Sequence, residues 1–238
     1  MPVMETGVYI VGTPIGNLED ITARALRTLR EANVIMAEDT RHTGILLARY
    51  EIRTPMVSCH KFNEAYRFER IRDEVAQGHA VAMVTDAGMP GISDPGARTV
   101  RMCRAAGIPV WVIPGPCAVS AAMSLSGMGD AGYHFEGFLP HKSGGRQRRL
   151  EELSHETLPV VFYESPYRLI KLMDQIEQFV GPRRIFVGRE LTKKFEEGIS
   201  GTPAEIRASF EKRSVKGEIV VIMAPAEKGQ GAHAVTAH

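Results

Sequence analysis

Short apolar runs alternate with amphipathic stretches along the first half of the chain. Ile21, Ala25, Leu26 and Leu29 recur at the spacing of one helical face. Continuous apolar runs predict buried strands over residues 7–11, 34–37, 80–85 and 110–113. Further helices are expected over residues 43–50, 63–77 and 95–106. This alternation predicts a mostly parallel sheet with helices covering both faces.

A second set of elements follows a sharp turn at residues 114–116. Helices are expected over residues 117–126, 169–179 and 203–212, and strands over residues 133–137, 159–163, 184–187 and 218–223. The expected fold class is therefore α/β, with an N-terminal lobe over residues 1–116 and a C-terminal lobe over residues 117–226. Residues 227–238 are rich in glycine, alanine and histidine and are expected to form a disordered tail.

Composition narrows the classes of function. The 238 residues carry a net charge of only +1, so any contact with nucleic acid must be local. The longest apolar run, residues 219–224, is too short to span a bilayer, so no membrane role is expected. Cys59, Cys103 and Cys117 form no CxxC pair. This spacing disfavours a disulfide scaffold and a zinc site, and it is typical of a cytoplasmic protein.

Three loops rich in glycine and proline follow predicted strands: residues 12–17 (GTPIGN), 85–96 (TDAGMPGISDPG) and 113–118 (IPGPCA). Glycine at the carboxyl end of a strand lets the backbone approach a ligand closely, and residues 85–96 are long for such a turn. Asp86 could accept a hydrogen bond from a ribose, or it could stabilise the turn. Asp94 is expected to cap the next helix. Residues 12–17 taken alone could equally form a plain turn between a strand and a helix. Residues 113–118 could equally form a stiff hinge between the lobes.

Polar clusters follow other predicted strands. In residues 37–43 (AEDTRHT), Asp39 or Thr40 is as readily a helix cap as a functional group. Glu164 and Glu190 could hold a ribose hydroxyl or an amine, or they could form surface ion pairs with neighbouring arginines. The basic segment 141–149 (HKSGGRQRR) suits a flexible phosphate-binding arm, although such a run is more often a solvated face.

Six motifs together are far more specific than any one of them. GTPIGN, AEDTRHT, DAGMPGISDPG, PGPCA, FYES and RELTK closely resemble, in order and spacing, the ribosomal RNA small-subunit methyltransferase I family of the tetrapyrrole-methylase superfamily. The resemblance covers residues 7–225. It implies two α/β lobes of the class III methyltransferase type, a homodimer, and S-adenosylmethionine in the cleft between the lobes. The implied activity is 2′-O-methylation of a cytidine in the decoding region of 16S rRNA, with the small ribosomal subunit as the expected partner.

Two departures bear on this resemblance. Relatives that act on tetrapyrroles usually carry GxGPGD in the first loop, so GTPIGN favours the RNA branch. Members of the family often continue with a further helical segment, whereas this sequence ends shortly after Pro225. A methylase of corrinoid precursors is the first alternative, although 7% aromatic residues offer little for a macrocycle. A non-enzymatic sensor of an adenosine ligand is the second, and it would not need the basic segment.

Carried over motif by motif, the resemblance assigns residues to each reactant. The cofactor pocket should include Pro14, Asp86, Ala87, Gly88, Gly91, Cys117, Ala118, Tyr163, Glu164 and Glu190. Asp39 and His42 are candidates for accepting the proton of the ribose hydroxyl, and Lys193 is a candidate for stabilising negative charge. The choice among these three stays open. RNA contacts are expected from Lys142, Arg146, Arg148 and Arg149, and no metal is expected.

Overall fold

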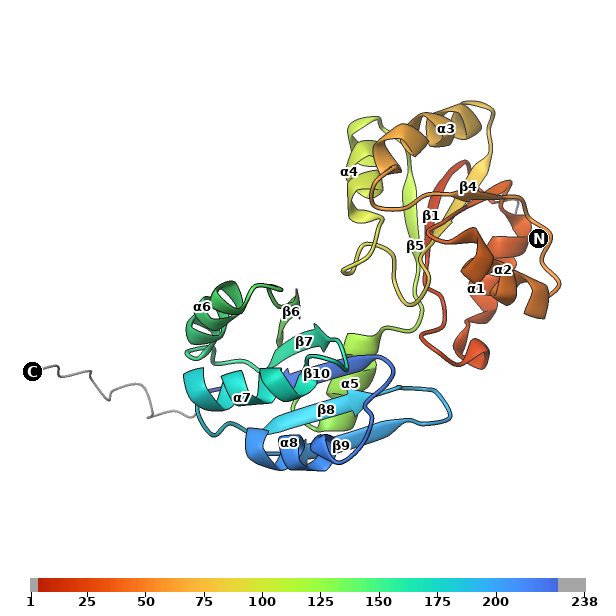
Figure 1. The fold of residues 1–238 in the computed structure, drawn as a ribbon. Helices are drawn as coiled ribbons and strands as arrows, with labels where there is room; N and C mark the ends of the chain where they lie inside the picture. The colour runs from red at the N-terminus through yellow and green to blue at the C-terminus, as the bar shows by residue number, and fades with distance from the viewer. Residues whose placement is uncertain (1–3, 227–238) are drawn as a thin grey trace, which may run out of the picture. The chain divides into compact units, whose positions relative to one another are not determined.

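The computed structural model describes residues 4–226, so the expected tail over residues 227–238 lies outside the described residues. Contacts divide the chain into two compact units, with the division between Cys117 and Ala118. Each unit contains one five-stranded sheet (Figure 1). The two units are described separately below.

The sheet of the first unit is parallel throughout. Its strand order is β3-β2-β4-β1-β5, and each neighbouring pair runs in the same direction. Its strands are β1 (Gly7–Val11), β2 (Val34–Ala37), β3 (Met56–Ser58), β4 (Ala80–Val84) and β5 (Val110–Ile113). Strands β1, β2 and β4 are buried at every position because helices cover both faces of the sheet. The predicted parallel sheet is confirmed.

Two helices cover each face of this sheet (Figure 1). The helical segments are η1 (Leu18–Asp20), α1 (Ala23–Glu31), α2 (Thr40–Arg49), α3 (Glu64–Ala76) and α4 (Ala97–Ala105). Leu29 of α1 and Leu47 of α2 pack in one hydrophobic cluster with Val11. Ile71 of α3 and Cys103 of α4 pack in a separate cluster on the opposite face. This layering leaves the ends of the strands as the place where loops can build a site.

The sheet of the second unit is mixed. Its strand order is β6-β7-β10-β8-β9, where β6 and β7 are parallel and the other three pairs are antiparallel. Its strands are β6 (His134–Phe138), β7 (Val160–Glu164), β8 (Ile185–Arg189), β9 (Glu197–Gly201) and β10 (Ile219–Met223). Glu164 and Arg189 both pair with Ile219, from opposite sides of β10. The carboxyl ends of β7 and β8 therefore lie at the same edge.

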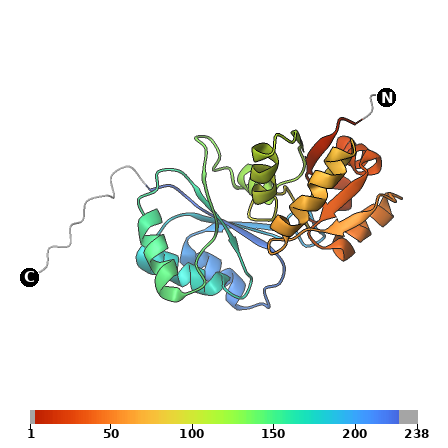
Figure 2. The same ribbon diagram turned by 90° about the horizontal axis from the view of Figure 1, so that it is seen from above.

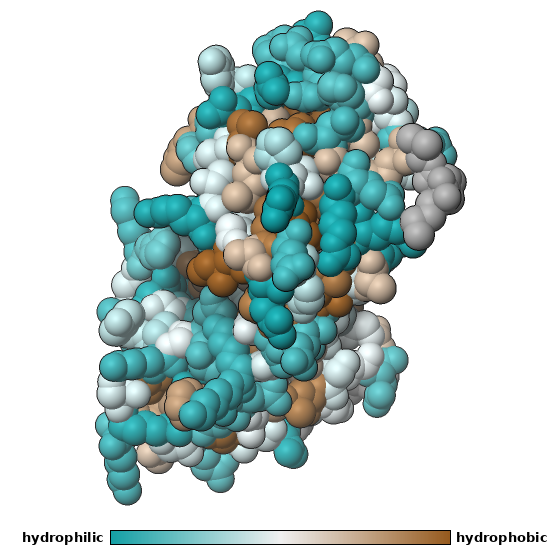
Figure 3. Space-filling model, turned by 90° about the vertical axis from the view of Figure 1, so that its right-hand side faces the viewer, coloured by the Kyte–Doolittle hydropathy of each residue, from teal (hydrophilic) through white to brown (hydrophobic). Residues whose placement is uncertain are grey.

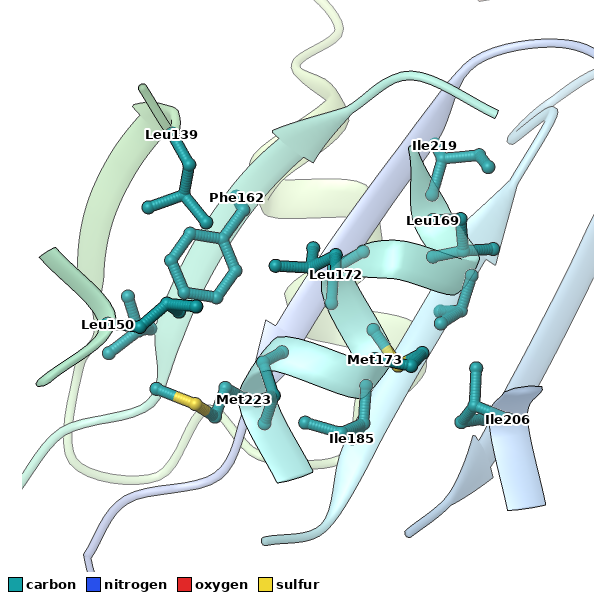
Figure 4. Packing of buried hydrophobic residues seen from close by; sticks show 14 of the residues in the cluster. Leu139, Leu150, Phe162, Leu169, Leu172, Met173, Ile185, Ile206, Ile219 and Met223 are labelled. Carbon is teal, nitrogen blue, oxygen red and sulfur yellow. The ribbon is translucent and has the colours of Figure 1, made fainter. Parts of the chain in front are cut away.

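Helices again cover both faces of the second sheet. They are α5 (Ala118–Ser126), α6 (Ser143–Leu153), α7 (Leu169–Phe179) and α8 (Pro203–Glu211). Figure 2 shows α6, α7 and α8 on one side of the sheet, and Figure 4 shows Leu150, Leu172 and Ile206 from these helices packed against it. Helix α5 contacts β8 and β10. Helix α8 begins with a capping box in which Thr202 and Glu205 satisfy each other's backbone N–H groups.

The sequence pattern misses four elements, η1, β3, β9 and α6, and it places the start of α2 three residues too late. The expected flexible arm over residues 141–149 is wrong, because most of that segment belongs to α6. Arg146, Leu150 and Leu153 are buried at helical spacing, so this helix is anchored by one face despite its two glycines. Helix α2 begins at Thr40 because Asp39 caps it.

On the face that Figure 3 shows, hydrophilic residues predominate and hydrophobic residues lie in separate patches. Large hydrophobic side chains that are exposed include Phe62, Tyr66, Phe138, Tyr167 and Phe195. Among residues 4–226, no helix is long and apolar enough to cross a membrane. The same residues contain no group of three or more His, Cys, Asp or Glu side chains that could hold a metal ion.

Burial makes the three thiols unequal in reactivity. Cys59 and Cys103 are buried, and desolvation raises the pKa of each to about 11. Cys117 is partly exposed, and all three are free cysteines. We expect an aromatic disulfide reagent to modify Cys117 alone in the native protein and all three thiols after unfolding. A Cys117→Ser variant is the control and should react only when unfolded; fast native reaction of a second thiol would contradict the burial argument.

Candidate functional site

The carboxyl ends of the parallel strands bring four loops to one edge of the first sheet. These loops follow β1, β2, β4 and β5 and contain residues 12–17, 38–39, 85–96 and 114–117. In open α/β sheets, ligands bind in the crevice outside this edge. The structure therefore brings together, within the first unit, the loops that the sequence assigned to the cofactor and to the proton acceptor.

A backbone ladder joins the loop after β1 to the long loop after β4. Thr13 N donates to Gly88 O at 2.9 Å, and Gly88 N donates to Thr13 O at 3.1 Å. The buried hydroxyl of Thr13 donates to Thr85 O at 3.1 Å. Pro14 and Gly88, both expected in the cofactor pocket, thus lie on neighbouring segments.

The loops after β1 and β5 touch through two glycines. A Cβ atom on Gly12 would lie 2.6 Å from Gly115 Cα, and a Cβ atom on Gly115 would lie 2.8 Å from Gly12 Cα. Any side chain at either position would force the two loops apart. The glycine of the Pro-Gly-Pro turn is therefore required by packing inside the first unit, in addition to any role as a hinge.

The long loop combines unusual backbone geometry with a buried hydroxyl. Gly88 and Gly91 have φ angles of +78° and +87°, which favour glycine. Asp86 and Ala87 are partly buried between the strand and these glycines. Thr85 Oγ1 is buried and has no hydrogen-bond partner among residues 4–226. The loop can offer backbone groups and this hydroxyl to a ligand without a side chain obstructing the approach.

Asp86 organises the loop that follows β2. Its Oδ1 atom accepts from Asp39 N at 3.1 Å, and its own N–H donates to Glu38 Oε2 at 3.3 Å. Burial raises the pKa of Glu38, and the nearby negative charge of Asp86 adds to the effect. Asp86 therefore has a structural role, as the alternative interpretation expected, but it joins two loops instead of stabilising a turn within one.

Asp39 and His42 share the first turn of α2 but differ in their bonding. Asp39 accepts from Arg41 N at 2.8 Å as the helix cap, and Arg41 Nη2 lies 2.6 Å from its second oxygen. Hydrogen bonds from Arg41 hold the pKa of Asp39 well below its usual range. An acceptor with so low a pKa is a poor general base. The His42 side chain is exposed, so among the two candidates it is the more accessible acceptor.

A buried glutamate, rather than Asp94, caps the helix after the long loop. Helix α4 begins after Gly96 without a side-chain cap from its own N-cap residue. Glu64 Oε1 accepts from Gly96 N at 3.0 Å, from Thr99 N at 3.2 Å and from Thr99 Oγ1 at 2.9 Å. The expectation that Asp94 caps α4 is therefore wrong. A carboxyl group from α3 reaches across and fixes the end of the loop.

Cys117 and Ala118 lie on either side of the division between the units. Both are partly exposed, and Ala118 is the first residue of α5. Their proposed contact with a cofactor stays a prediction.

In the second unit, Glu190 and Lys193 form a closed ionic cluster after β8. Lys193 Nζ lies 2.8 Å from Glu190 Oε1 and 2.8 Å from Glu218 Oε2. Burial opposes the charge on Lys193, but these two hydrogen bonds raise its pKa on balance. Lys193 is therefore a firmly charged ammonium that two carboxylates already offset.

Glu164 and Tyr163 end β7 at the same edge. The side chain of Glu164 is buried, and its Oε1 atom accepts from Ser165 N at 2.7 Å and lies 3.1 Å from Arg168 Nε. The expected alternative, an ion pair with Arg168, is present but buried rather than at the surface. The Tyr163 ring packs edge-on against Phe135 at a centroid distance of 5.1 Å.

The four basic residues expected to contact RNA differ in accessibility. Arg146 is 3% exposed and its Nε atom donates to Gln175 Oε1, so its side chain points into the protein. Arg149 forms ion pairs with Glu136 and Glu152. Lys142 and Arg148 are exposed. The expected contact between Arg146 and RNA is wrong, because a buried guanidinium cannot reach a phosphate.

Comparison with known proteins decides the family. The model of the tetrapyrrole (corrin/porphyrin) methylases matches residues 7–207. The chain belongs to this methylase family. The motif-based recognition is thereby confirmed at the level of the family, and the α/β fold class with two sheets agrees with it.

One curated relative is similar in sequence, and two solved structures are similar in fold. A protein of Thermotoga maritima named ribosomal RNA small subunit methyltransferase I is 45% identical over 220 residues, which are 92% of this chain and 99% of the relative. A cobalt-precorrin-4 methyltransferase of cobalamin biosynthesis matches with a TM-score of 0.68 and 16% identity over 91% of this chain and 94% of that chain. A uroporphyrin-III C-methyltransferase of Thermus thermophilus, complexed with S-adenosylhomocysteine, matches with a TM-score of 0.64 and 21% identity over 92% and 97%.

Sequence reasoning overlooked several residues of this candidate site. Glu38 stands in a motif that was singled out, but a partly buried glutamate next to a partly buried aspartate carries no distinguishing signal. Glu64 lies 32 residues before the N–H group of Gly96 that it accepts from, so no local pattern could reveal it. Thr13 stands inside the first motif, and only the pairing with Gly88 shows what it does.

The cap from Glu64 yields a stability prediction. Replacing Glu64 with alanine leaves two backbone N–H groups and the Thr99 hydroxyl without their acceptor, so we expect the free energy of unfolding to fall by about 2 kcal/mol. Glu64→Gln keeps one carbonyl oxygen and should lose less than half as much. Urea denaturation followed by circular dichroism measures both effects.

The matched control is Glu69→Ala on the same helix, where the glutamate forms an exposed ion pair with Arg72. This variant should change the free energy of unfolding by less than about 0.5 kcal/mol. Equal losses for Glu64→Ala and Glu69→Ala would show that the cap contributes nothing.

Proposed function

We propose that this chain transfers a methyl group from S-adenosylmethionine to the ribose 2′-oxygen of a cytidine in the decoding region of 16S rRNA. The observation that carries the proposal is the relative named ribosomal RNA small subunit methyltransferase I, which is 45% identical and matches along 99% of its own length. The two solved methyltransferases named above are 16% and 21% identical and support the fold alone. We further propose the homodimer and the small ribosomal subunit as assembly and substrate, on the strength of the motif resemblance.

The residues of the first unit fit a folded nucleoside cofactor. Such a ligand needs close backbone approach, which Gly88 and Gly91 permit through their positive φ angles. It also offers polar groups to satisfy the buried Thr85 hydroxyl, which lacks a partner among residues 4–226. Pro14, Asp86 and Ala87 would complete this side of the pocket. Cys117, Ala118, Tyr163, Glu164 and Glu190 remain proposed contacts, as does the cleft between the lobes.

S-adenosylmethionine supplies an electrophilic methyl group when it is bound, so the protein has to position the ribose hydroxyl and take up its proton. His42 is our candidate for the proton acceptor, because Asp39 is committed to Arg41 and to the helix end. Its exposed imidazole offers a ring nitrogen that can accept a proton. Lys193 is a weaker candidate for charge stabilisation, since Glu190 and Glu218 already offset its charge. Lys142 and Arg148, exposed on and beside α6, are the proposed phosphate contacts.

The cofactor proposal is tested at Gly88. A valine there combines a φ of +78° with branched carbons in the loop, where the Cβ atom already lies 3.5 Å from Ile15 Cγ2. We expect the affinity for S-adenosylhomocysteine, measured by calorimetry, to fall at least tenfold while unfolding stays cooperative. Gly107→Val is the matched control, because Gly107 has a φ of +70° with nothing within 4 Å of its Cβ position. Equal affinity in the two variants would remove the long loop from the cofactor site.

The activity itself is tested by transfer of labelled methyl groups to undermethylated small ribosomal subunits, to free 16S rRNA and to precorrins. We expect incorporation into ribosomal RNA at one ribose, located by resistance to alkaline cleavage next to a 2′-O-methyl group. Labelling of precorrins instead would establish the corrinoid alternative, and cofactor binding without any transfer would favour the sensor.

The base is tested by comparing three variants in the same assay. General-base catalysis contributes roughly 10²- to 10⁴-fold, so His42→Asn should lower kcat by about that range and leave the affinity for S-adenosylhomocysteine unchanged. Asp39→Asn should keep most activity, because asparagine is also a good helix cap. Lys193→Met should have an intermediate effect or none. Full activity of His42→Asn would exclude the imidazole as the base.

A further inference from the structure

The loop between β3 and α3 lies beside the proposed catalytic residues but has no role in the site described so far. It follows β3 at the same sheet edge, and Cys59 N donates to Ala37 O at 2.7 Å, directly before Glu38. His60 is close enough to Glu38 for its charge to act on that carboxyl group. This segment, residues 59–63, therefore borders the Glu38–Asp39 loop within one unit.

Side-chain hydrogen bonds hold this loop in a defined shape. Asn63 Oδ1 accepts from His60 N at 2.7 Å, and Asn63 Nδ2 donates to Ser58 O at 3.3 Å. Arg67 Nε donates to the same carbonyl at 2.9 Å. Phe62 N donates to His60 Nδ1 at 3.3 Å. These polar groups bond to atoms of the loop and of neighbouring β3. The position of Phe62 at the apex of the loop is therefore fixed.

That fixed apex displays aromatic side chains to solvent. Phe62 is 92% exposed and Tyr66, on the first turn of α3, is 76% exposed. A hydrophobic staple would pair Phe62 with the residue at the fourth helical position, but that residue is Arg67. Burial in the core therefore does not account for either ring. Single exposed apolar residues are common, but one aromatic ring on the loop and a second on the helix turn that follows it form a surface feature.

The charges of residues 59–67 that reach the surface are positive, whereas Glu69, one helical turn after Tyr66, is exposed and paired with Arg72. Lys61 is exposed, and Arg67 Cζ lies 5.5 Å from the centre of the Tyr66 ring. The one acidic residue in the segment 59–67 is Glu64, whose carboxyl group is buried against α4. Aromatic rings interleaved with cations are what unpaired RNA recognises, because bases stack on the rings while phosphates meet the cations.

We propose that Phe62 and Tyr66 form a stacking platform for unpaired bases next to the methylated nucleotide, with Lys61 and Arg67 contacting the phosphates. This platform rests on the proposed function for its substrate, and it deepens that function by naming where single-stranded RNA lies on the first unit. A second copy of the chain is the competing occupant. A two-fold interface centred here would set the cations of Lys61 and Arg67 against their own copies, so the charge favours RNA.

The test measures methyl transfer to undermethylated small subunits together with direct filter binding of 16S rRNA. Phe62→Ala should raise both the KM for subunits and the Kd for rRNA roughly 5- to 100-fold, the range for losing one stacked base. The affinity for S-adenosylhomocysteine and the melting temperature should not change, because the ring is exposed. Phe62→Trp should restore binding, whereas Phe62→Leu, which keeps an apolar surface without a stacking face, should not.

Salt dependence separates stacking from phosphate contact. Lys61→Ala should lower the slope of log Kd against log salt concentration by about 0.7, the value for one phosphate contact on a single strand. Phe62→Ala should weaken binding at every salt concentration without changing the slope. Phe195→Ala is the matched control, because Phe195 is also an exposed aromatic residue with a cation, Lys194, over its ring. It should bind rRNA as the unaltered protein does.

Each result has a defined consequence. Unchanged Kd in Phe62→Ala, or equal rescue by leucine and tryptophan, overturns the stacking platform. Dissociation of a dimer into monomers by Phe62→Ala, seen in sedimentation, assigns the patch to a second copy and also overturns it. If the unaltered protein methylates no rRNA yet Phe62→Ala still weakens rRNA binding in this pattern, the proposed function fails while the RNA platform stands.

Discussion

The position of β1 between β4 and β5 is the constraint on which the candidate site depends. Because β1 is an interior strand and ends at Val11, the residues that follow it must pass between the loops of both neighbours. Gly12 makes that passage possible by its contact with Gly115, and Thr13 then pairs with Gly88. These contacts hold together three loops that are far apart in the sequence, and they do so without a ligand.

Backbone N–H groups are the main partners of the buried acids at this edge. Asp86 accepts from Asp39 N, and Glu64 accepts from Gly96 N and Thr99 N. Such bonds fix loops without adding a net positive charge to the site, which suits a pocket for a cationic sulfonium cofactor. The same arrangement gives Asp39 and Asp86 structural contacts beside the chemical roles that their positions suggest.

The second unit contains many charged groups that already satisfy each other. Lys193 is held by Glu190 and Glu218, and Arg149 by Glu136 and Glu152. A paired charge attracts a phosphate less than a solvated one, so the number of basic residues in a segment overstates its affinity for RNA. By contrast, the loop before α3 has few basic residues, but they are not neutralised by Glu64, whose carboxylate is buried against α4. The distribution of partners, rather than the net charge of +1, decides which surfaces can attract a phosphate.

The sequence by itself determined the strands with continuous apolar runs: β1, β2 and β5 have the predicted bounds. Burial on both faces requires such runs in β1 and β2, whereas β5 is an edge strand in which Val112 is exposed. It also determined which loops carry glycine and polar residues, because these follow directly from the order of residues. Only the tertiary structure decided what those residues touch. Glu64 rather than Asp94 caps α4, and Arg146 points into the protein instead of toward solvent. A local pattern records the type of each residue, whereas partners that lie tens of residues away are set by how the sheets and helices pack.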